Sequence, residues 1–293
     1  MKLFCFGLGY TALALARRLM ADGWSVAGTC RHEDKCKSLG AAGIEAVPFD
    51  RGRPLERPDA ALKGSTHVLV SAPPDANGDP VLDHHRVHLL ALRNVQWIGY
   101  LSTTGIYGDT GGATVDESAM ANPSTERARR RVMAEKRWLA LRHHEGLPVH
   151  VFRLAGIYGP GRSVFERVRA GTAQRIDRPD HLFSRIHVDD IAAVLQASIA
   201  KPRTGAIYNV CDDTPATPAE VTAHACTLIG MKPPPLISFE DAKKTMSPMA
   251  LSFWLDNRRV DNGLIKRELG IKFAYPSYKE GLAAVLAAEK KSA

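Results

Sequence analysis

Short apolar runs alternate with helical patterns along the first half of the chain. Residues 2–6 are largely apolar, a glycine turn follows, 10–21 has helical spacing, and 25–29 is the next apolar run. Because strands that alternate with helices pair in parallel, this pattern predicts an α/β fold with a doubly wound parallel sheet. The remaining expected strands are 43–47, 66–71, 96–102 and 149–153, and the longer expected helices are 80–93 and 126–144.

The pattern becomes irregular after residue 155, where loops rich in glycine and proline separate short elements. A later apolar run, 206–210, is expected to return to the main sheet. We therefore predict a main domain of residues 1–155, to which 183–211 returns. A smaller substrate-binding region, made of 156–182 and 212–293, is expected to lie over the carboxyl edge of the sheet.

The first turn carries a phosphate-binding pattern. Gly7-Leu8-Gly9-Tyr10-Thr11-Ala12 matches G-x-G-x-x-A between an expected strand and an expected helix, which is the context of a dinucleotide fingerprint in a Rossmann fold. Gly7 permits the tight turn, Gly9 lets the backbone approach a pyrophosphate, and Ala12 allows the helix to pack closely on the strand. The residues expected to bind the dinucleotide here are Gly7, Gly9, Tyr10, Thr11 and Ala12.

The end of the second expected strand indicates which dinucleotide is bound. A site that prefers NAD usually has an acid there, but this strand ends Gly28-Thr29-Cys30-Arg31. A guanidinium fits the 2′-phosphate of NADP in a bidentate manner, so Arg31 favours NADP(H), with NAD(H) as the alternative. An Arg31 that is only a surface charge remains the competing interpretation.

The formal net charge of +8 and the arginine run 127–131 raise nucleic-acid binding as a further interpretation. The 31 acidic residues and the absence of a recognisable nucleic-acid-binding module disfavour it, and a solvated helix face is the expected role of the run.

Five cysteines without a C-x-x-C pair are expected to be buried thiols. His84, His85 and His88 are expected to form a solvated helix face, and we expect no metal site. The chain shows neither a signal peptide nor an apolar run of membrane-spanning length, which predicts a cytoplasmic protein without membrane partners.

Four later segments, taken in order, resemble the extended short-chain dehydrogenase/reductase family, the NAD-dependent epimerase/dehydratase group. The resemblance covers nearly the whole chain and is closer still to an atypical bacterial branch described only as nucleoside-diphosphate-sugar epimerases. The segments are Leu101-Ser102-Thr103-Thr104-Gly105-Ile106-Tyr107-Gly108, Arg153-Leu154-Ala155-Gly156-Ile157-Tyr158-Gly159-Pro160-Gly161-Arg162, His187-Val188-Asp189-Asp190-Ile191-Ala192 and Tyr208-Asn209-Val210-Cys211.

The resemblance implies roles for residues beyond the phosphate turn. Asp50 would approach the adenine, and Ser71, Ala72 and Pro73 would line the dinucleotide. Thr103 falls where the family keeps a catalytic Ser or Thr, whose hydroxyl can bind a substrate oxygen as its charge changes. A Thr103 that only satisfies local backbone is the equally weighted alternative. The resemblance also implies a homodimer through the helices 80–93 and 126–144.

The family's catalytic Y-x-x-x-K pair is missing. Alignment on Glu135 puts Arg127 at the tyrosine position and Arg131 at the lysine position. Arg131 would still contact the nicotinamide ribose, but a permanently protonated arginine cannot replace the tyrosine as a proton shuttle. Tyr107 is the replacement we consider best, against a packing role as the alternative.

Other polar residues receive secondary roles. Arg162 and Arg167 are expected to bind an anionic group of the substrate. Asp189 or Asp190 is expected to cap the following helix, with His187 orienting that loop.

The residues therefore support three functional hypotheses. The first is an NAD(P)-dependent oxidoreductase or epimerase acting on a small polar substrate, for which a nucleotide sugar is one candidate. The second is a dinucleotide-binding or redox-sensing protein without hydride chemistry, which the missing Tyr and Lys favour. The third, nucleic-acid binding through Arg127–Arg131, ranks last.

Overall fold

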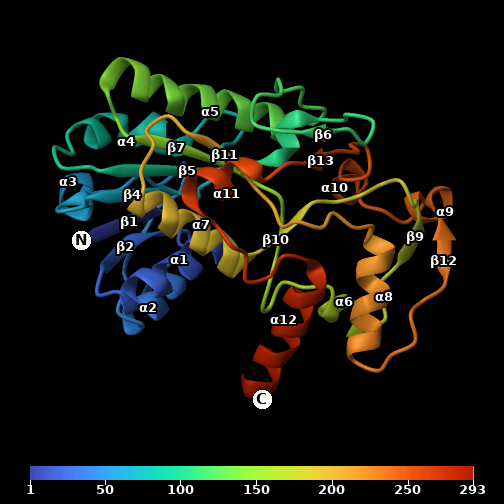
Figure 1. The fold of residues 1–293 in the computed structure, drawn as a ribbon. Helices are drawn as coiled ribbons and strands as arrows, with labels where there is room; N and C mark the ends of the chain where they lie inside the picture. Colours follow the sequence, from blue (N-terminus) through green and yellow to red (C-terminus); the bar gives the residue numbers. More distant parts are fainter. Residues whose placement is uncertain (293) are drawn as a thin grey trace.

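A seven-stranded parallel sheet forms the centre of the computed structural model, which describes residues 1–292 (Figure 1). The predicted α/β fold with a doubly wound parallel sheet is confirmed, and 207–210 returns to the sheet edge beside 149–154 as expected. In order across the sheet, the strands are β11 (Ile207–Val210), β7 (Val149–Leu154), β5 (Trp97–Thr103), β4 (His67–Val70), β1 (Lys2–Phe6), β2 (Ser25–Cys30) and β3 (Glu45–Pro48).

Helices cover both faces of the sheet because side chains alternate along each strand. On β1, Leu3 and Cys5 face one apolar cluster, and Phe4 and Phe6 face the other. The first cluster is covered by α1 (Tyr10–Ala21), α2 (Glu33–Ala41), α7 (Val188–Ala200) and α11 (Gly263–Leu269). The second is covered by α3 (Pro58–Leu62), α4 (Pro80–Leu90) and α5 (Glu126–Glu145).

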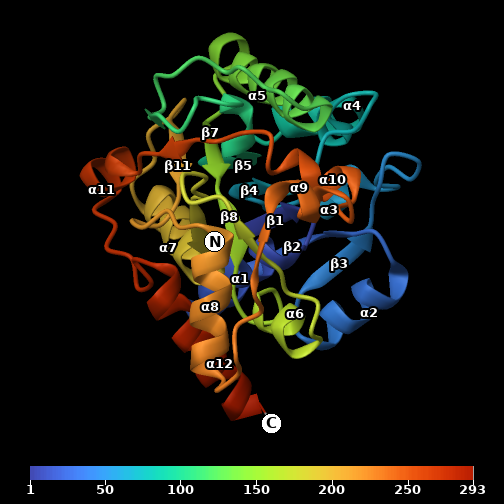
Figure 2. The ribbon, with the colours of Figure 1, turned by 90° about the vertical axis from the view of Figure 1, so that its right-hand side faces the viewer.

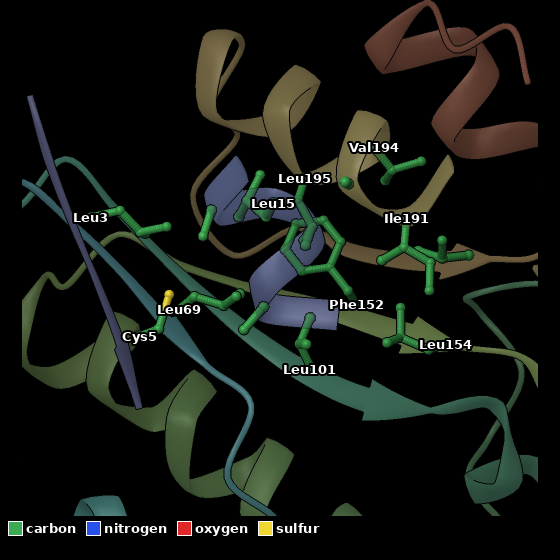
Figure 3. Packing of buried hydrophobic residues seen from close by; sticks show 14 of the residues in the cluster. Leu3, Cys5, Leu15, Leu69, Leu101, Phe152, Leu154, Ile191, Val194 and Leu195 are labelled. Carbon is green, nitrogen blue, oxygen red and sulfur yellow. The ribbon is translucent and has the colours of Figure 1, made fainter. Parts of the chain in front are cut away.

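The larger of these clusters joins helices that are far apart in sequence. Figure 3 shows Leu69 and Phe152 from the strands meeting Leu15 of α1 and Leu195 of α7. Burial of each such side chain stabilises the fold by roughly 1.5–3 kcal/mol. This packing fixes α1, and with it the phosphate turn, against the sheet.

The start of α7 differs from the prediction. His187 is the N-cap, and its Nδ1 accepts a hydrogen bond from the Asp189 amide at 3.2 Å. Asp190 instead accepts from the amides of Ala274 and Tyr275, at 2.9 and 3.0 Å. The expectation that an aspartate caps this helix was therefore wrong, since the Asp190 carboxylate holds a distant segment of chain in place.

Smaller elements from the second half of the chain gather beside the sheet, and Figure 2 shows α8 next to α12 in this part of the molecule. Their apolar side chains form separate clusters around Phe165 and around Trp254. The helices are α6 (Phe165–Arg169), α8 (Pro218–Leu228), α9 (Phe239–Lys243), α10 (Pro248–Ser252) and α12 (Tyr278–Ser292). The strands form three parallel pairs, β8 (Gly156–Tyr158) with β10 (Arg185–His187), β9 (Arg175–Asp177) with β12 (Leu236–Ser238), and β6 (Thr114–Val115) with β13 (Arg259–Val260). The division into two regions stays a prediction.

The histidines of α4 do not form a solvated face. His85 is 1% exposed, its Nε2 accepts from the Leu55 amide at 3.3 Å, and burial lowers its pKa to about 4. Val87 on α4 and Met133 on α5 are exposed apolar side chains on the helices expected to form a dimer, which stays a prediction. Among the helices of residues 1–292, none is both long and apolar enough to span a membrane.

Candidate dinucleotide and substrate site

Hydrogen bonds to Thr29, near the end of β2, hold the phosphate turn in place. The Gly7 amide donates to Thr29 Oγ1 at 2.8 Å, and the Leu8 amide donates to the Thr29 carbonyl at 2.7 Å. Gly7 has a φ of +92°, and a Cβ there would lie 3.1 Å from the Ala72 amide nitrogen. Both the conformation and the space therefore require glycine at this position.

Helix α1 begins at this turn with Gly9 as its N-cap. No side chain among the described residues caps the helix, so the first-turn amides and the positive end of the helix dipole remain available to an anion. Ala12 is fully buried, as close packing of helix on strand requires, and a Cβ on Gly9 would lie 4.0 Å from Ser71 Oγ. The cradle fits a pyrophosphate.

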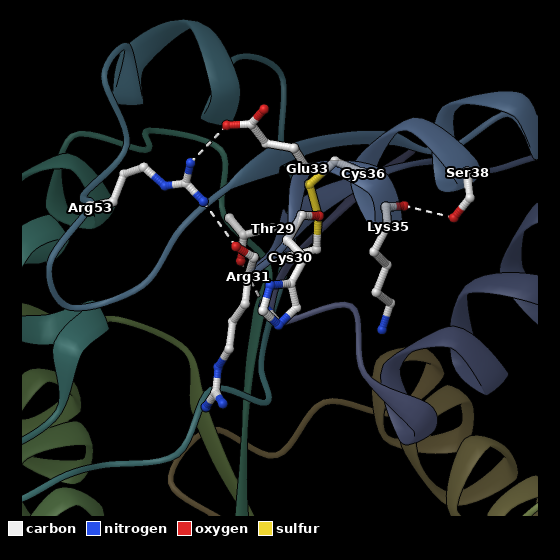
Figure 4. Close-up of a disulfide and its surroundings, with 10 residues drawn as sticks. Thr29, Cys30, Arg31, Glu33, Lys35, Cys36, Ser38 and Arg53 are labelled. Atoms are coloured by element: carbon white, nitrogen blue, oxygen red, sulfur yellow. Dashed lines mark hydrogen bonds and ion pairs between the residues drawn. A yellow bond between two sulfur atoms is a disulfide. The ribbon is translucent and has the colours of Figure 1, made fainter.

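Two residues predicted to contact the adenosine half follow neighbouring strands. Arg31 comes directly after β2, and its exposed guanidinium extends away from Arg53 (Figure 4). Arg53 donates to the Arg31 carbonyl at 2.9 Å and pairs with Glu33 at 3.0 Å. Asp50, beyond β3, accepts from the Gly52 amide at 2.8 Å and so closes its own turn.

A disulfide lies beside this loop and corrects the expectation of five thiols. Cys30 at the end of β2 is bonded to Cys36 in α2, with 6.0 Å between their Cα atoms (Figure 4). Cys5, Cys211 and Cys226 are buried free cysteines, as expected. The disulfide closes the short loop that carries Arg31.

A cavity of about 1370 Å³ opens at the carboxyl ends of the central strands. Part of the predicted site borders it, namely Tyr10, Thr11, Ser71, Pro73, Thr103, Arg131, Arg162 and Arg167. The other predicted residues lie outside its lining, namely Gly7, Gly9, Ala12, Arg31, Asp50, Ala72 and Tyr107. The structure thus brings the start of α1, the end of β5 and the start of α5 to one space.

Thr103 is the last residue of β5 and reaches this cavity. Its Oγ1 accepts a hydrogen bond from the Gly105 amide at 3.1 Å, which caps the 3-10 turn Thr104–Tyr107. Within residues 1–292 its hydroxyl donates to no described partner. The local backbone role and a donor role toward a ligand are therefore compatible.

Three members of the arginine run, Arg127, Arg130 and Arg131, border the cavity, so the run does not form only a solvated face. Arg131 Nη1 donates to the Leu101 carbonyl at 2.7 Å and to the Tyr100 hydroxyl at 3.1 Å. The Arg127 guanidinium lies 5.4 Å from the centre of the Phe253 ring. The positions aligned with the catalytic pair are thus occupied by two anchored cations.

Tyr107 does not fit the role of a replacement proton shuttle. It is 2% exposed, and its hydroxyl donates to Asn209 Oδ1 at 2.7 Å and accepts from Arg153 Nη1 at 2.8 Å. Arg153 in turn forms a buried ion pair with Glu135 at 3.0 Å. Burial raises the pKa of Tyr107. This closed network, outside the cavity lining, supports the packing role.

Arg162 and Arg167 border the cavity, and both side chains are exposed. The Arg162 guanidinium lies 5.7 Å from the centre of the Tyr10 ring, and the Tyr10 hydroxyl donates to the Pro160 carbonyl at 2.9 Å. The loop that carries Arg162 therefore lies over the start of α1. Its guanidinium can contact cofactor phosphates as well as substrate.

Tyr158 and Arg185 border another part of the cavity, and Asp212, which is outside the lining, is buried. Burial raises the pKa of Asp212 to about 8 and lowers that of Arg185 to about 10. The Tyr158 hydroxyl donates to the Ser277 carbonyl at 3.3 Å, and a Cβ on Gly281 of α12 would lie 2.0 Å from that hydroxyl oxygen. Helix α12 can approach the cavity this closely only because residue 281 is glycine.

The lining carries an excess of positive charge. Its carboxylates, Asp75, Glu166 and Asp256, are hydrogen-bonded to Arg51, Ser163 and Arg258. The lining arginines are Arg127, Arg130, Arg131, Arg162, Arg167, Arg185 and Arg258. Such a surface favours anionic ligands. In the part of the chain that the structure describes, no cluster of three or more His, Cys, Asp or Glu could hold a metal ion.

Sequence reasoning missed Asp256 and Arg258, whose side chains are only 8% and 18% exposed. They follow α10 in a stretch without a recognisable motif. In the sequence they are only a pair of opposite charges in an irregular region. Such a pair cannot be distinguished from two charged residues on the surface.

Comparisons with known proteins agree with this geometry. The family model "NAD dependent epimerase/dehydratase family" matches residues 7–211. Protein YeeZ of Escherichia coli K12 is 28% identical over an alignment of 294 residues. The alignment covers 94% of this chain and 96% of YeeZ. A solved protein of unknown function from Silicibacter pomeroyi is 46% identical, with a TM-score of 0.90 and 98% of each chain covered.

Solved enzymes with lower identity share the fold. The dTDP-glucose 4,6-dehydratase of Bacillus anthracis, in complex with NAD, is 18% identical with a TM-score of 0.78, covering 99% of this chain and 97% of that one. The UDP-glucuronic acid 4-epimerase of Bacillus cereus, also with NAD, is 14% identical with a TM-score of 0.77, covering 99% of each chain.

Proposed function

The chain belongs to the NAD-dependent epimerase/dehydratase family, and we propose that it is an NAD(P)-dependent oxidoreductase or epimerase acting on a small anionic substrate. One observation carries the proposal. An uncapped α1 behind a glycine turn opens into a large, positively charged cavity that also contains Thr103.

The dinucleotide is held by this chain's own groups in the following way. Its pyrophosphate would lie against the first-turn amides of α1 at Tyr10 and Thr11, because the Gly9 amide already donates to the Gly7 carbonyl, and Ser71 at the end of β4 would face it. Thr29 keeps the turn in the conformation that this contact needs. When bound, the nicotinamide supplies hydride exchange with the substrate.

Arg31 selects the nucleotide in this proposal. Its exposed guanidinium follows β2, where no acid occupies the position typical of an NAD-preferring site. Its pairing with a 2′-phosphate makes NADP(H) the preferred cofactor and leaves NAD(H) as the weaker one. The solved relatives named above that carry a dinucleotide hold NAD, so this preference needs its own test.

Thr103 and Arg131 act on the substrate and the cofactor ribose, respectively. The Thr103 hydroxyl is available to donate to a substrate oxygen, because its oxygen already accepts from Gly105. Arg131 is anchored on Leu101 and keeps further guanidinium donors for ribose hydroxyls. Thr103 therefore polarises the oxygen, and the arginines at positions 127 and 131 do not carry the proton that the family tyrosine carries.

A second candidate function is dinucleotide binding without turnover. Arg127 and Arg131 in place of the Tyr and Lys favour it, because neither guanidinium can exchange a proton near neutral pH. This candidate keeps the cofactor site and predicts no oxidation or reduction of bound nucleotide by any substrate.

Calorimetric titration with NADPH, NADP⁺, NADH and NAD⁺ tests the proposal without a known substrate. We expect NADP(H) to bind more tightly than NAD(H), and Arg31→Ala to weaken NADP(H) about tenfold, as for one charge-assisted bidentate contact. Lys35→Ala, which removes an exposed cation from the same loop region, is the matched control and should change affinity less than about twofold. Absence of binding by all four nucleotides would refute the cofactor site.

Turnover separates the two candidates. The protein loaded with its preferred nucleotide is mixed with nucleotide sugars and with small hydroxy and oxo acids. Nicotinamide absorbance detects net oxidation or reduction, and NMR of the added compound detects epimerisation, which leaves the nucleotide unchanged overall. Turnover that falls in Thr103→Val while nucleotide affinity is unchanged supports the enzyme. Tight nucleotide binding without turnover for any substrate class supports the second candidate.

A further inference from the structure

Arg258 reaches the cavity from a part of the chain far from the phosphate turn. It lies between α10 and β13, and the pairing of β13 with β6, where Arg259 lies opposite Thr114, fixes the backbone next to it. Its side chain is 18% exposed and borders the cavity. Arg162 and Arg167, which the sequence pointed to as anion-binding, are exposed instead.

One edge of the Arg258 guanidinium is held rigidly. Nη1 donates to the Gly108 carbonyl and to Asp256 Oδ2, both at 3.0 Å. Gly108 has a φ of +66°, and a Cβ there would lie 1.9 Å from the Asn122 carbonyl oxygen, so only glycine fits at this position. Because the clamp is preorganised, a ligand would not have to order the guanidinium on binding.

The other edge is available and lies near Thr103. A Cβ placed on Gly105 would be 3.8 Å from Arg258 Nη2 and 3.3 Å from Thr103 Oγ1, so both groups face the same small space beside Gly105. Among the described residues, Nε and Nη2 of Arg258 make no hydrogen bond. These two nitrogens form the side-on fork that matches two oxygens of a carboxylate or phosphate.

Asp256, which holds Arg258, has a carboxylate oxygen without a hydrogen-bond partner among the described residues. Its side chain is 8% exposed and borders the cavity, and within residues 1–292 its Oδ1 is buried without a hydrogen-bond partner. A buried carboxylate oxygen without a donor costs free energy, so a ligand hydroxyl would relieve it. An anionic group with a neighbouring hydroxyl satisfies both residues.

We propose that Arg258 binds an anionic group of the substrate, a carboxylate or a phosphate, beside the oxygen that Thr103 contacts. The inference deepens the proposed function by naming the substrate class. Since Arg258 and Thr103 face one small space, the anion lies only a few bonds from the reacting carbon. The diphosphate of a nucleotide sugar, separated from the reacting carbon by much of the sugar, would be held elsewhere in the cavity.

Anion titration tests this assignment. The protein, with and without saturating NAD⁺, is titrated calorimetrically with malonate, inorganic phosphate and the uncharged malonamide. We expect at least one anion to bind and malonamide not to bind. Arg258→Met should raise the dissociation constant at least tenfold. The matched Arg130→Met, which removes another arginine of the cavity lining that pairs with Glu126, should raise it less than threefold. Tighter malonate binding assigns a carboxylate, and tighter phosphate binding assigns a phosphate.

Several outcomes would overturn the assignment. These are equal anion affinity in Arg258→Met and the unmodified protein, a larger loss of affinity in Arg130→Met than in Arg258→Met, or no anion binding at all. Failure of the proposed function is seen separately, as absent nucleotide binding, because the anion titration also runs without NAD⁺.

A second measurement needs no variant, in case Arg258→Met fails to fold. Crystals of the unmodified protein are soaked in selenate, and anomalous diffraction locates the selenium. A selenate within hydrogen-bond distance of Arg258 Nη2 supports the assignment. Selenate bound only at other arginines or at the start of α1 overturns it.

Discussion

Replacing Tyr107 by phenylalanine removes one oxygen from a buried network and nothing from the cavity wall. That oxygen accepts from Arg153 at 2.8 Å and donates to Asn209 at 2.7 Å. Arg153 keeps its ion pair with Glu135, but Asn209 Oδ1 loses the tyrosine donor in a fully buried position. The variant therefore isolates the structural role that we assign to Tyr107.

The expected loss of stability follows from those two bonds. A hydrogen bond to a charged group contributes about 1.5–3 kcal/mol, and a buried acceptor without a donor costs about 1–3 kcal/mol. Since the guanidinium retains other partners, we expect Tyr107→Phe to lower the free energy of unfolding by about 2–4 kcal/mol. For a chain of this size, that lowers the melting temperature by roughly 3–7 °C.

Urea unfolding measures the expected loss of stability, and nucleotide titration measures whether nucleotide affinity stays unchanged. Tyr208→Phe is the matched control, because its ring is fully buried but its hydroxyl donates to the partly exposed Glu268, which water can still solvate. It should therefore lose less stability than Tyr107→Phe. We expect NAD(P) affinity of Tyr107→Phe to stay unchanged. An unchanged stability together with abolished turnover would refute the reasoning and restore Tyr107 as a catalytic residue.

Two further predictions concern the turn and the buried acid. Thr29→Val leaves the Gly7 amide without its acceptor, so we expect the free energy of unfolding in urea to fall by about 1–3 kcal/mol and nucleotide affinity to fall roughly three- to tenfold. Thr222→Val is the control, because its hydroxyl bonds only its own helix. Equal losses in both variants would contradict the role of Thr29. Burial raises the pKa of Asp212 from 3.8 to about 8 in the folded protein. Between pH 4 and pH 8 the folded protein therefore binds a proton that the unfolded chain has released, so the free energy of unfolding should fall as pH rises from about 4 to about 8. Asp212→Asn should remove a slope of up to about 1.4 kcal/mol per pH unit, measured by urea unfolding across that range, and identical slopes in both proteins would show that Asp212 is not the titrating group.

The sequence predicted the parts of the site that local patterns determine. The limits of α1 and β1 agree with the expected ranges, because apolar periodicity and the glycine turn lie within one stretch of chain. The return of 207–210 to the sheet was also predictable, since the strand follows a helix-sized segment. Local spacing is enough for elements of this kind.

The rest of the site depends on contacts between distant residues. Gly108 and Arg258 are 150 residues apart, and Tyr107 and Asn209 are 102 apart, so no window of sequence contains both partners. The same limit explains the error at His85, whose exposure depends on the Leu55 segment packing over α4. Without these partners, Arg258 could not be distinguished from a solvated arginine, nor Tyr107 from a cavity residue.

The order in which the cavity walls occur along the chain has a consequence for protein synthesis. Strand β11 completes the sheet at Val210, whereas Arg258 and the Gly281 contact with Tyr158 are translated later. At roughly 5–20 residues per second, the ribosome needs several seconds more to make them. The strands of the sheet are thus complete before Arg258, α11 and α12 have been made, so the cavity wall that Arg258 and α12 form is the last to be added.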